Sequence, residues 1–187
     1  MHRYDERDLL KRIKNDPQAF GLVYDEYYNS IFSYVFRRLA NYDLAKDVTA
    51  ETFLKAYQKI RVFEWRNIPI SAWLFRIATN EINLYFRHSK YNPVCIEDTN
   101  LHVYLTYEEE IETEKAALEK ELQENKEFLL IQKKLRGLNI KYQEVIALRF
   151  FEEKSIKEIA AILRKKEGTI KSLLSRGLEK LRIVLEK

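Results

Sequence analysis

The stretch that decides the fold is SIKEIAAILRKKEGTIKSLLSRGLEKLR, residues 155–182. Its first part repeats apolar residues at helical spacing, and the small Ala160 stands where a second helix would cross closely. In the second part the apolar residues share one arc: Ile170, Leu173, Leu174, Leu178, Leu181 and Leu185. Mainly hydroxyl and charged side chains share the opposite arc, with Lys171 at its border: Gly168, Thr169, Ser172, Ser175, Arg176 and Glu179. A short helix, a basic turn and a second helix of this kind predict a helix-turn-helix.

The turn of this motif is unusual. Arg164 occupies the position where glycine is common, and a non-glycine residue with positive φ is uncommon, so the sequence leaves the geometry of this turn open. Lys165 follows where an apolar residue is common. An ordinary amphipathic helix pair would show the same apolar spacing, and the rest of the chain has to decide between the two.

Composition indicates a helical protein with real hydrophobic cores. The 187 residues include only 4 Gly and 3 Pro, which leaves little turn chemistry for a β protein, so an all-α fold is expected. Cys95 is the only cysteine and three His residues are scattered, so we expect no disulfide, metal site or cofactor. The charged N-terminus and the absence of a long apolar run predict a cytoplasmic protein without membrane insertion.

Charge divides the chain into three segments. Residues 1–92 carry a net charge of +4, residues 93–124 carry −8, and residues 125–187 carry +8. Helical periodicity is lost after Asn92-Pro93. We therefore predict two small helical domains, 1–92 and 125–187, joined by an acidic linker, 93–124. Basic domains favour a polyanionic partner.

Two helix starts are indicated within residues 1–60. Asp16 followed by Pro17 is a helix start signal, and Asp43 can cap a helix running to Ile60. The second helix places four side chains toward a core: Leu44, Val48, Phe53 and Tyr57.

Residues 61–90 contain the second nucleic-acid signal. The loop after a helix ending near Ile60 combines aromatic and hydrogen-bonding groups that suit unpaired bases and their phosphates: Arg61, Phe63, Trp65, Arg66 and Asn67. The alternative is that its aromatic side chains pack into the core. The helix predicted from Ala72 to Lys90 places four side chains on one line opposite its apolar side: Arg76, Asn80, Asn83 and Arg87. Arg and Asn can bond both phosphates and base edges, so this line favours nucleic acid over a merely solvated face.

Three runs of residues, in this order, carry a family resemblance: DVTAETFLKAY at 47–57, WLFRIATN at 73–80, and Ile159-Ala160 with GTIKS at 168–172 and Arg176. The chain resembles bacterial RNA polymerase sigma factors of the sigma-70 family, extracytoplasmic-function (ECF) group. The resemblance covers nearly the whole chain. It implies a region 2-like helical bundle and a region 4-like helix-turn-helix domain. Such a protein reads the duplex −35 element and melts and captures the −10 element.

The resemblance also implies roles for individual residues and partners. Binding of core polymerase, through the clamp helices of its largest subunit and its flap, would use Asp47, Glu51, Lys55 and Gln58. Recognition of −10 DNA would use Arg61, Phe63, Trp65, Arg66, Asn67, Arg76, Asn80, Asn83 and Arg87. Recognition of −35 DNA would use Lys165, Lys166, Thr169, Lys171, Ser172, Ser175 and Arg176. An anti-sigma factor is a further partner of this family, and no small-molecule substrate is implied.

Two other classes compete with this interpretation. A free-standing helix-turn-helix regulator explains residues 125–187 but leaves the Asp47/Glu51 helix and the aromatic loop without a role. An enzyme is disfavoured because Asp47 and Glu51, one helical turn apart, have no Glu-x-x-His partner. No nucleophile–base constellation or glycine-rich phosphate loop is present in the sequence either.

Overall fold

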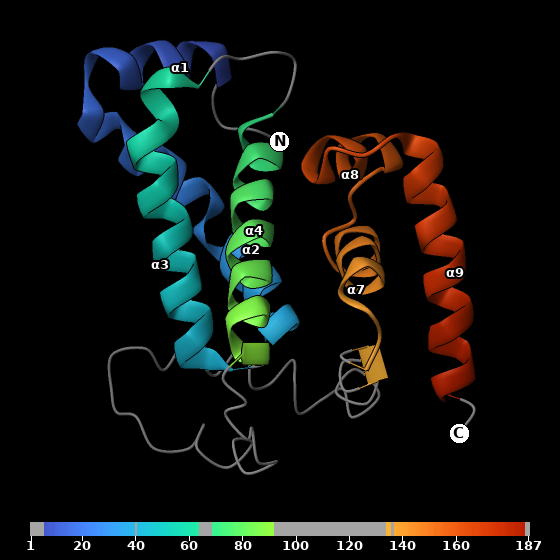
Figure 1. Cartoon of the computed structure of the whole chain (residues 1–187). Coiled ribbons are helices and arrows are strands. Elements are labelled where there is room, and N and C mark those ends of the chain that lie inside the picture. Colours follow the sequence, from blue (N-terminus) through green and yellow to red (C-terminus); the bar gives the residue numbers. More distant parts are fainter. Residues whose placement is uncertain (1–5, 40, 64–68, 92–133, 136, 186–187) are drawn as a thin grey trace.

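The computed structural model describes residues 6–39, 41–63, 69–91, 134–135 and 137–185. Within these residues all regular secondary structure is helical, which confirms the predicted all-α fold. Figure 1 shows two groups of helices side by side, which we call the N-terminal bundle and the C-terminal bundle. The N-terminal bundle contains α1 (Glu6–Asn15), η1 (Pro17–Phe20), α2 (Gly21–Leu39), α3 (Tyr42–Lys59), η2 (Ile60–Val62) and α4 (Ile70–Tyr91). The C-terminal bundle contains α7 (Ile140–Ile146), the π-helical turn η5 (Ala147–Phe151), α8 (Ile156–Leu163) and α9 (Glu167–Leu185).

Short polar side chains begin several of these helices. Asp16 accepts a hydrogen bond from the Gln18 amide at 3.0 Å and precedes Pro17, as the sequence predicts. The expectation that Asp43 caps α3 is wrong. Asn41 is the cap, because its side chain accepts from the Leu44 amide at 2.9 Å, while Asp43 lies in the first turn of the helix.

The core of the N-terminal bundle is built by α2, α3 and α4. A buried polar chain crosses it: Tyr34 Oη and Thr79 Oγ1 are 2.9 Å apart, and Thr79 donates to the Phe75 carbonyl. Arg38, only 2% exposed, donates to Tyr34 Oη at 3.1 Å. These hydrogen bonds join α2 to α4 in one register. Arg38 Nε and Nη2 are buried without a hydrogen-bond partner among the described residues.

The buried side of α3 differs from the sequence prediction. Tyr57, expected in the core, is 47% exposed, although its ring meets Phe20 edge-on with centroids 5.3 Å apart. Phe53 is buried as expected, and small or short side chains fill the rest of the seam: Ala45, Val48, Thr49, Thr52 and Ala56. Small residues let α3 approach its neighbours closely, which leaves a tyrosine at the edge of the contact.

The C-terminal bundle packs α9 against α7 and α8. Gly177 lies in the α7–α9 seam, where a Cβ would come within 3.2 Å of Ile146 and 3.3 Å of Tyr142. The helices therefore touch at a residue that the apolar pattern did not include. Leu178 and Leu185, predicted on the buried arc, are 40% and 42% exposed, because the seam runs through Gly177 instead.

The helix-turn-helix prediction is confirmed by α8 and α9. Ser155 and Glu158 form a complete capping box at the start of α8. Arg164 ends the helix in the left-handed conformation, with φ 53° and ψ 45°, which decides the turn geometry that the sequence left open. The Lys165 amide then closes the turn by donating to the Ala160 carbonyl at 3.0 Å.

Candidate nucleic-acid interface

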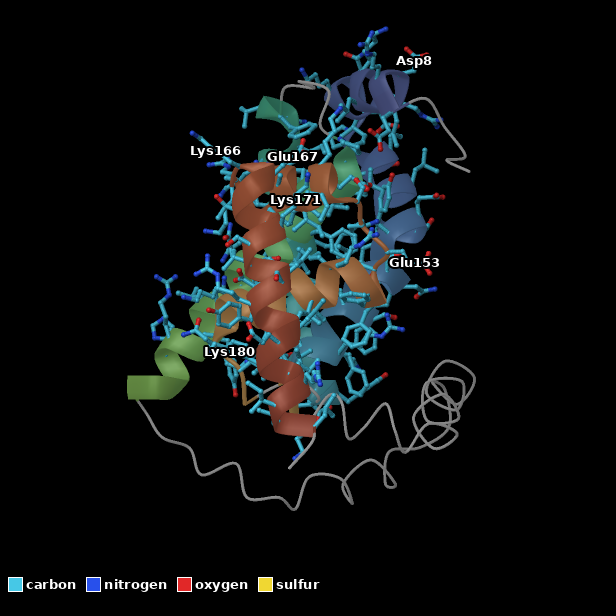
Figure 2. All side chains as sticks on the ribbon, turned by 90° about the vertical axis from the view of Figure 1, so that its right-hand side faces the viewer. Asp8, Glu153, Lys166, Glu167, Lys171 and Lys180 are labelled. Carbon is cyan, nitrogen blue, oxygen red and sulfur yellow. The ribbon has the colours of Figure 1, made fainter. Side chains whose placement is uncertain are left out.

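The α9 side of the helix-turn-helix presents a free polar face. Lys165 and Lys166 precede α9 and are exposed. On the helix itself the exposed members of the predicted −35 set are Thr169, Lys171, Ser175 and Arg176, and Ser172 is half-buried. Figure 2 views α9 from the front, with Lys166, Glu167 and Lys171 near its N-terminal end and Lys180 farther along. The structure thus presents these seven predicted residues along one turn and one helix.

Arg176 is folded back onto α9. Its Nε donates to the Ser172 carbonyl at 3.3 Å, and its Nη2 donates to Ser172 Oγ. Both partners are exposed or half-buried on the helix surface, so the guanidinium can exchange these bonds for a phosphate or a base edge.

The four predicted residues of α4 do not share one environment. Asn80 and Arg87 are exposed, whereas Arg76 and Asn83 are half-buried against the C-terminal bundle. Arg76 Nη2 donates to the Ala161 carbonyl at 2.5 Å and its Nε to the Ile162 carbonyl at 3.2 Å. Burial, and then the charge of Arg164, lower the pKa of the Arg76 guanidinium. Arg76 therefore satisfies carbonyls at the C-terminal end of α8, where a cation also complements the helix dipole.

Asn83 makes the second contact between the bundles. Its Nδ2 donates to Glu144 Oε1 at 2.6 Å, and Glu144 is itself buried. A third contact joins Arg37 to Glu152, with 3.2 Å between Arg37 Nη1 and Glu152 Oε1; the same nitrogen donates to the Phe151 carbonyl. Burial raises the pKa of Glu152, although the charges of Arg37 and Lys154 and the hydrogen bond from Arg37 oppose that rise.

The predicted −10 loop is described only in part. Arg61 is exposed, and Phe63 is half-buried with its ring centroid 4.6 Å from that of Trp73. Phe63 thus packs partly against the core, as the alternative interpretation of this loop held. Trp65, Arg66 and Asn67 lie outside the described residues.

A hollow of about 880 Å³ lies where the two bundles meet. Its lining combines cationic, aromatic and small apolar residues: Lys59, Val62, Phe63, Trp73, Arg76, Ala160, Ala161, Arg164, Lys165 and Lys166. None of these lining residues is acidic. Residues predicted for −10 and for −35 recognition therefore line the same hollow.

The predicted polymerase-binding residues lie on α3. Asp47 and Gln58 are exposed. Lys55 Nζ lies 3.1 Å from Glu51 Oε1 and 2.6 Å from Glu81 Oε2, which joins α3 to α4. Its hydrogen bond with Glu81 raises the pKa of the Lys55 ammonium. Glu81 of α4 is therefore the partner of Lys55.

Several residues of these surfaces were not predicted from the sequence. Leu54, 50% exposed, and Tyr57 add apolar area to the outer side of α3. Arg37, Glu144 and Glu152 belong to the contact between the bundles, and their partners lie 61 to 115 positions away. No local sequence signal predicts pairs at that separation.

Two other features, a metal site and a membrane-spanning helix, are not found among the described residues. Among them no cluster of three or more His, Cys, Asp and Glu side chains could hold a metal ion. None of the helices among them combines the length and apolarity needed to cross a bilayer.

A helical bundle joined to a helix-turn-helix domain with an exposed cationic helix defines a class of DNA-binding protein. Comparison with known families agrees with this class. Residues 23–91 match the Sigma-70 region 2 family and residues 128–181 match the Sigma-70 region 4 family.

Individual relatives resemble the chain over most of its length. It is 33% identical over 181 residues to the ECF RNA polymerase sigma factor SigW of Bacillus subtilis (strain 168), covering 95% of this chain and 96% of SigW. It is 32% identical over 175 residues to the ECF sigma factor BldN of Streptomyces coelicolor, covering 93% of this chain but only 63% of BldN. The chain belongs to the ECF group of RNA polymerase sigma factors.

Solved structures share the fold. CnrH, in complex with the cytosolic domain of CnrY, aligns with a TM-score of 0.69 at 20% identity over 96% of each chain. The sigma factor RpoE from Bartonella quintana, in complex with the anti-sigma factor NepR, aligns with a TM-score of 0.62 at 25% identity over 92% of this chain and 98% of RpoE.

Proposed function

We propose that this protein is a promoter-specificity subunit: it binds core RNA polymerase and directs initiation at promoters with defined −35 and −10 elements. The observation that carries this proposal is the exposed hydroxyl and cationic face of α9 after the left-handed Arg164 turn, in a chain that also carries a region 2 bundle. Sigma factors as a class are DNA-binding initiation factors rather than enzymes. We assign no catalytic activity to this chain, and we place its action in the cytoplasm, where promoter DNA is found in bacteria.

The roles of the surfaces follow from their chemistry. The outer side of α3 would dock on polymerase through Asp47, Glu51, Lys55 and Gln58, with Leu54 and Tyr57 adding apolar contact. The first turns of α9 would enter the major groove of the −35 element, with Lys165 and Lys166 on phosphates and Thr169, Ser172 and Arg176 near base edges. The α4 line and the loop before it would hold the −10 strand by phosphate contacts and base stacking.

The domain division supports simultaneous reading of two sites. Domains at 1–92 and 125–187, joined by the linker 93–124, can reach elements about two helical turns, or roughly 70 Å, apart. An anti-sigma factor is a further proposed partner, because the similar RpoE was solved in complex with one.

In vitro transcription tests the proposal directly. Purified protein is added to bacterial core polymerase with a genomic DNA library, and the 5′ ends of the transcripts are sequenced. New transcripts that share −35 and −10 elements are expected. Specific retention of DNA by the protein alone, with no such transcripts, would instead favour the free-standing regulator.

The second test separates the −10 and −35 roles. Trp65→Ala in the holoenzyme is expected to impair strand opening, followed with a fluorescent base analogue, more than binding of a −35 duplex, because aromatic stacking contributes about 1–3 kcal/mol per base. Equal loss of both activities would argue against a single-strand role for Trp65.

A further inference from the structure

The N-terminal end of α4 is capped by a residue of another helix. The Pro69 carbonyl accepts from the Trp73 amide at 3.2 Å, so Pro69 occupies the N-cap position, where it offers no side-chain acceptor. The Ile70 amide donates instead to Glu6 at the start of α1, at 3.3 Å to Oε1 and 3.2 Å to Oε2. The first turn of α4 contains no acidic residue, so the Glu6 carboxylate also complements the positive pole of the helix dipole. Glu6 therefore supplies the cap that Pro69 cannot.

A tyrosine fixes the Glu6 carboxylate from a third helix. Tyr27 of α2, only 7% exposed, donates its hydroxyl to Glu6 Oε1 at 3.2 Å. Burial, and then the charge of Glu6 and the hydrogen bond to it, raise the pKa of Tyr27, and the charge of Glu26 acts in the same direction. The hydroxyl therefore keeps its proton and remains a donor. Glu6 thus joins α1, α2 and α4 at one point.

The same helix α1 also packs against η2, the turn that follows α3. Three buried side chains anchor α1: Leu9, Leu10 and Ile13. Figure 1 shows α1 at the end of the N-terminal bundle where α3 ends and α4 begins. Because η2 and the first turn of α4 are the described elements on either side of the proposed −10 loop, α1 contacts the elements on both sides of that loop.

The first turns of α4 carry part of the surface that we assign to the −10 strand. The Trp73 ring lies in the first turn, with its centroid 4.6 Å from that of Phe63, and Arg76 follows on the same helix. All three line the hollow where the bundles meet. A shift of the start of α4 relative to η2 would separate Phe63 from Trp73 and change the shape of this surface. Recognition is strongest when such groups are held in place before the ligand binds.

We propose that Glu6 is a positioning residue for −10 recognition: it ties the start of α4 to α1 and α2 and so fixes the spacing between Phe63 and the first turn of α4. Glu6 acts through the Ile70 amide and does not itself contact DNA. This role rests on the proposed function, because the spacing matters only if the loop and α4 hold the −10 strand.

Two substitutions of Glu6 and a matched control test this role. Glu6→Ala removes both carboxylate oxygens. Glu6→Gln removes the charge but keeps one carbonyl oxygen that can accept from the Ile70 amide. Asp8→Ala is the matched control, because it removes the same charge at an exposed position of the same helix, where Asp8 Oδ1 lies 3.0 Å from Lys11 Nζ (Figure 2).

Hydrogen exchange at the Ile70 amide, followed by NMR in the full chain, measures the cap without DNA. We expect Glu6→Ala to speed this exchange about fivefold, the factor that corresponds to loss of a typical helix cap. Glu6→Gln should have a smaller effect and Asp8→Ala none. Unchanged exchange after Glu6→Ala overturns the cap and the positioning role with it.

Promoter opening by the holoenzyme measures the consequence for DNA. The probe is a promoter mapped in the transcription experiment, with a fluorescent base analogue in its −10 element, and binding of a −35 duplex is measured in parallel. Glu6→Ala should lower the extent of opening about fivefold, because molecules with a displaced start of α4 are not competent to open DNA. Binding of the −35 duplex should not change, and Glu6→Gln should lie between Glu6→Ala and wild type.

A second control separates positioning from a general loss of stability. Val35→Ala removes fully buried apolar volume about two turns along α2 from Tyr27, and it should lower the free energy of unfolding without changing promoter opening. A comparable loss of opening in Val35→Ala would overturn the positioning role, because instability alone would then explain the effect of Glu6→Ala.

The two measurements separate failure of this role from failure of the proposed function. Faster exchange with unchanged opening overturns the positioning role and leaves Glu6 as a helix cap alone. Equal loss of opening and of −35 binding overturns it as well, because the defect would not be confined to the −10 surface. A wild-type holoenzyme that opens no promoter would refute the −10 part of the proposed function, and the positioning role with it, whatever the exchange at Ile70 shows.

Discussion

The two proposed DNA-reading helices differ in what covers them. On α9 the predicted residues face solvent, apart from half-buried Ser172, and their hydrogen bonds stay within the helix, as between Arg176 and Ser172. On α4 the residues at positions 76 and 83 are engaged by the other bundle, while Asn80 and Arg87 between and beyond them are exposed. The sequence predicted an exposed polar face on both helices, yet only the face on α9 is exposed along its length. Exposure depends on what packs against a helix and not on the helix alone.

The buried residues beneath α4 and α9 should contribute equally to the free energy of unfolding, even though the outer faces of these two helices differ in exposure. Leu74 under α4 and Ile170 under α9 are both fully buried. Leu74→Ala and Ile170→Ala should each lower the free energy of unfolding by about 2–5 kcal/mol, measured in urea, because each leaves a cavity. Leu84→Ala, at an exposed position of α4, serves as the control. A loss of unfolding free energy below about 1 kcal/mol at either buried site would contradict an equal contribution of the two cores to stability.

The difference in coverage predicts a difference between Arg76→Ala and Asn80→Ala. In the free protein Arg76→Ala should lower stability by about 1 kcal/mol, because it removes two charge-assisted hydrogen bonds at a partly exposed site. Asn80→Ala should leave it unchanged. Hydrogen exchange at the C-terminal end of α8 measures the effect locally. Faster exchange after Asn80→Ala, or none after Arg76→Ala, would remove the distinction between the two positions.

The two ends of α8 offer a finer comparison, since Ser155 holds one end locally and Arg76 holds the other from a distance. Ser155→Ala should lower the free energy of unfolding by about 1 kcal/mol through loss of the cap. Although burial alone would raise the pKa of Glu158, its hydrogen bonds with Ser155 and the charge of Lys154 lower it below the ordinary value of 4.5.

This pKa shift gives the cap a pH dependence. Because the pKa of Glu158 is lower in the folded state, its contribution is present above about pH 4.5 and is lost as the pH falls through the lowered pKa. Thermal unfolding of wild type and Glu158→Gln between pH 7 and pH 3 should therefore converge at the acid end, because both proteins keep the Ser155 hydroxyl cap and differ only in the charge at position 158. A constant difference across this range would show that Glu158 does not contribute through its charge.

The smallest expected effect concerns the salt dependence of DNA binding by the exposed face of α9. Lys165→Ala or Lys166→Ala should each reduce the slope of log affinity against log salt by about one for −35 duplex binding by the holoenzyme. Between 50 and 200 mM salt this equals about a fourfold smaller loss of affinity. Lys180→Ala, toward the other end of α9, should leave the slope unchanged. An unchanged slope in both turn variants would remove these lysines from the phosphate contacts.

Much of the site could be predicted because its signals are local. The helix-turn-helix follows from the spacing of two apolar patterns around a basic turn, and the exposed face of α9 follows from its apolar arc. The left-handed conformation of Arg164 was not predicted, because that position commonly holds glycine. Apart from the Asp43 cap, the predictions that are wrong concern which side chain fills a seam. Tyr57 and Leu178 are more exposed than expected, because small residues at Ala56 and Gly177 take the contacts. Hydrophobicity indicates a buried side, whereas the shape of the facing helix selects the residue.

The sequence by itself determined the all-α class, most helix starts, the helix-turn-helix and the cationic face of α9, because hydrogen bonds and periodicity within a few residues suffice for each. Only the tertiary structure decided that Lys55 pairs with Glu81, and that Arg37, Arg76 and Asn83 meet the C-terminal bundle. The physical reason is that a charged side chain has many equivalent partners along a chain. Which of them it meets is fixed only when packing brings distant segments within hydrogen-bond distance.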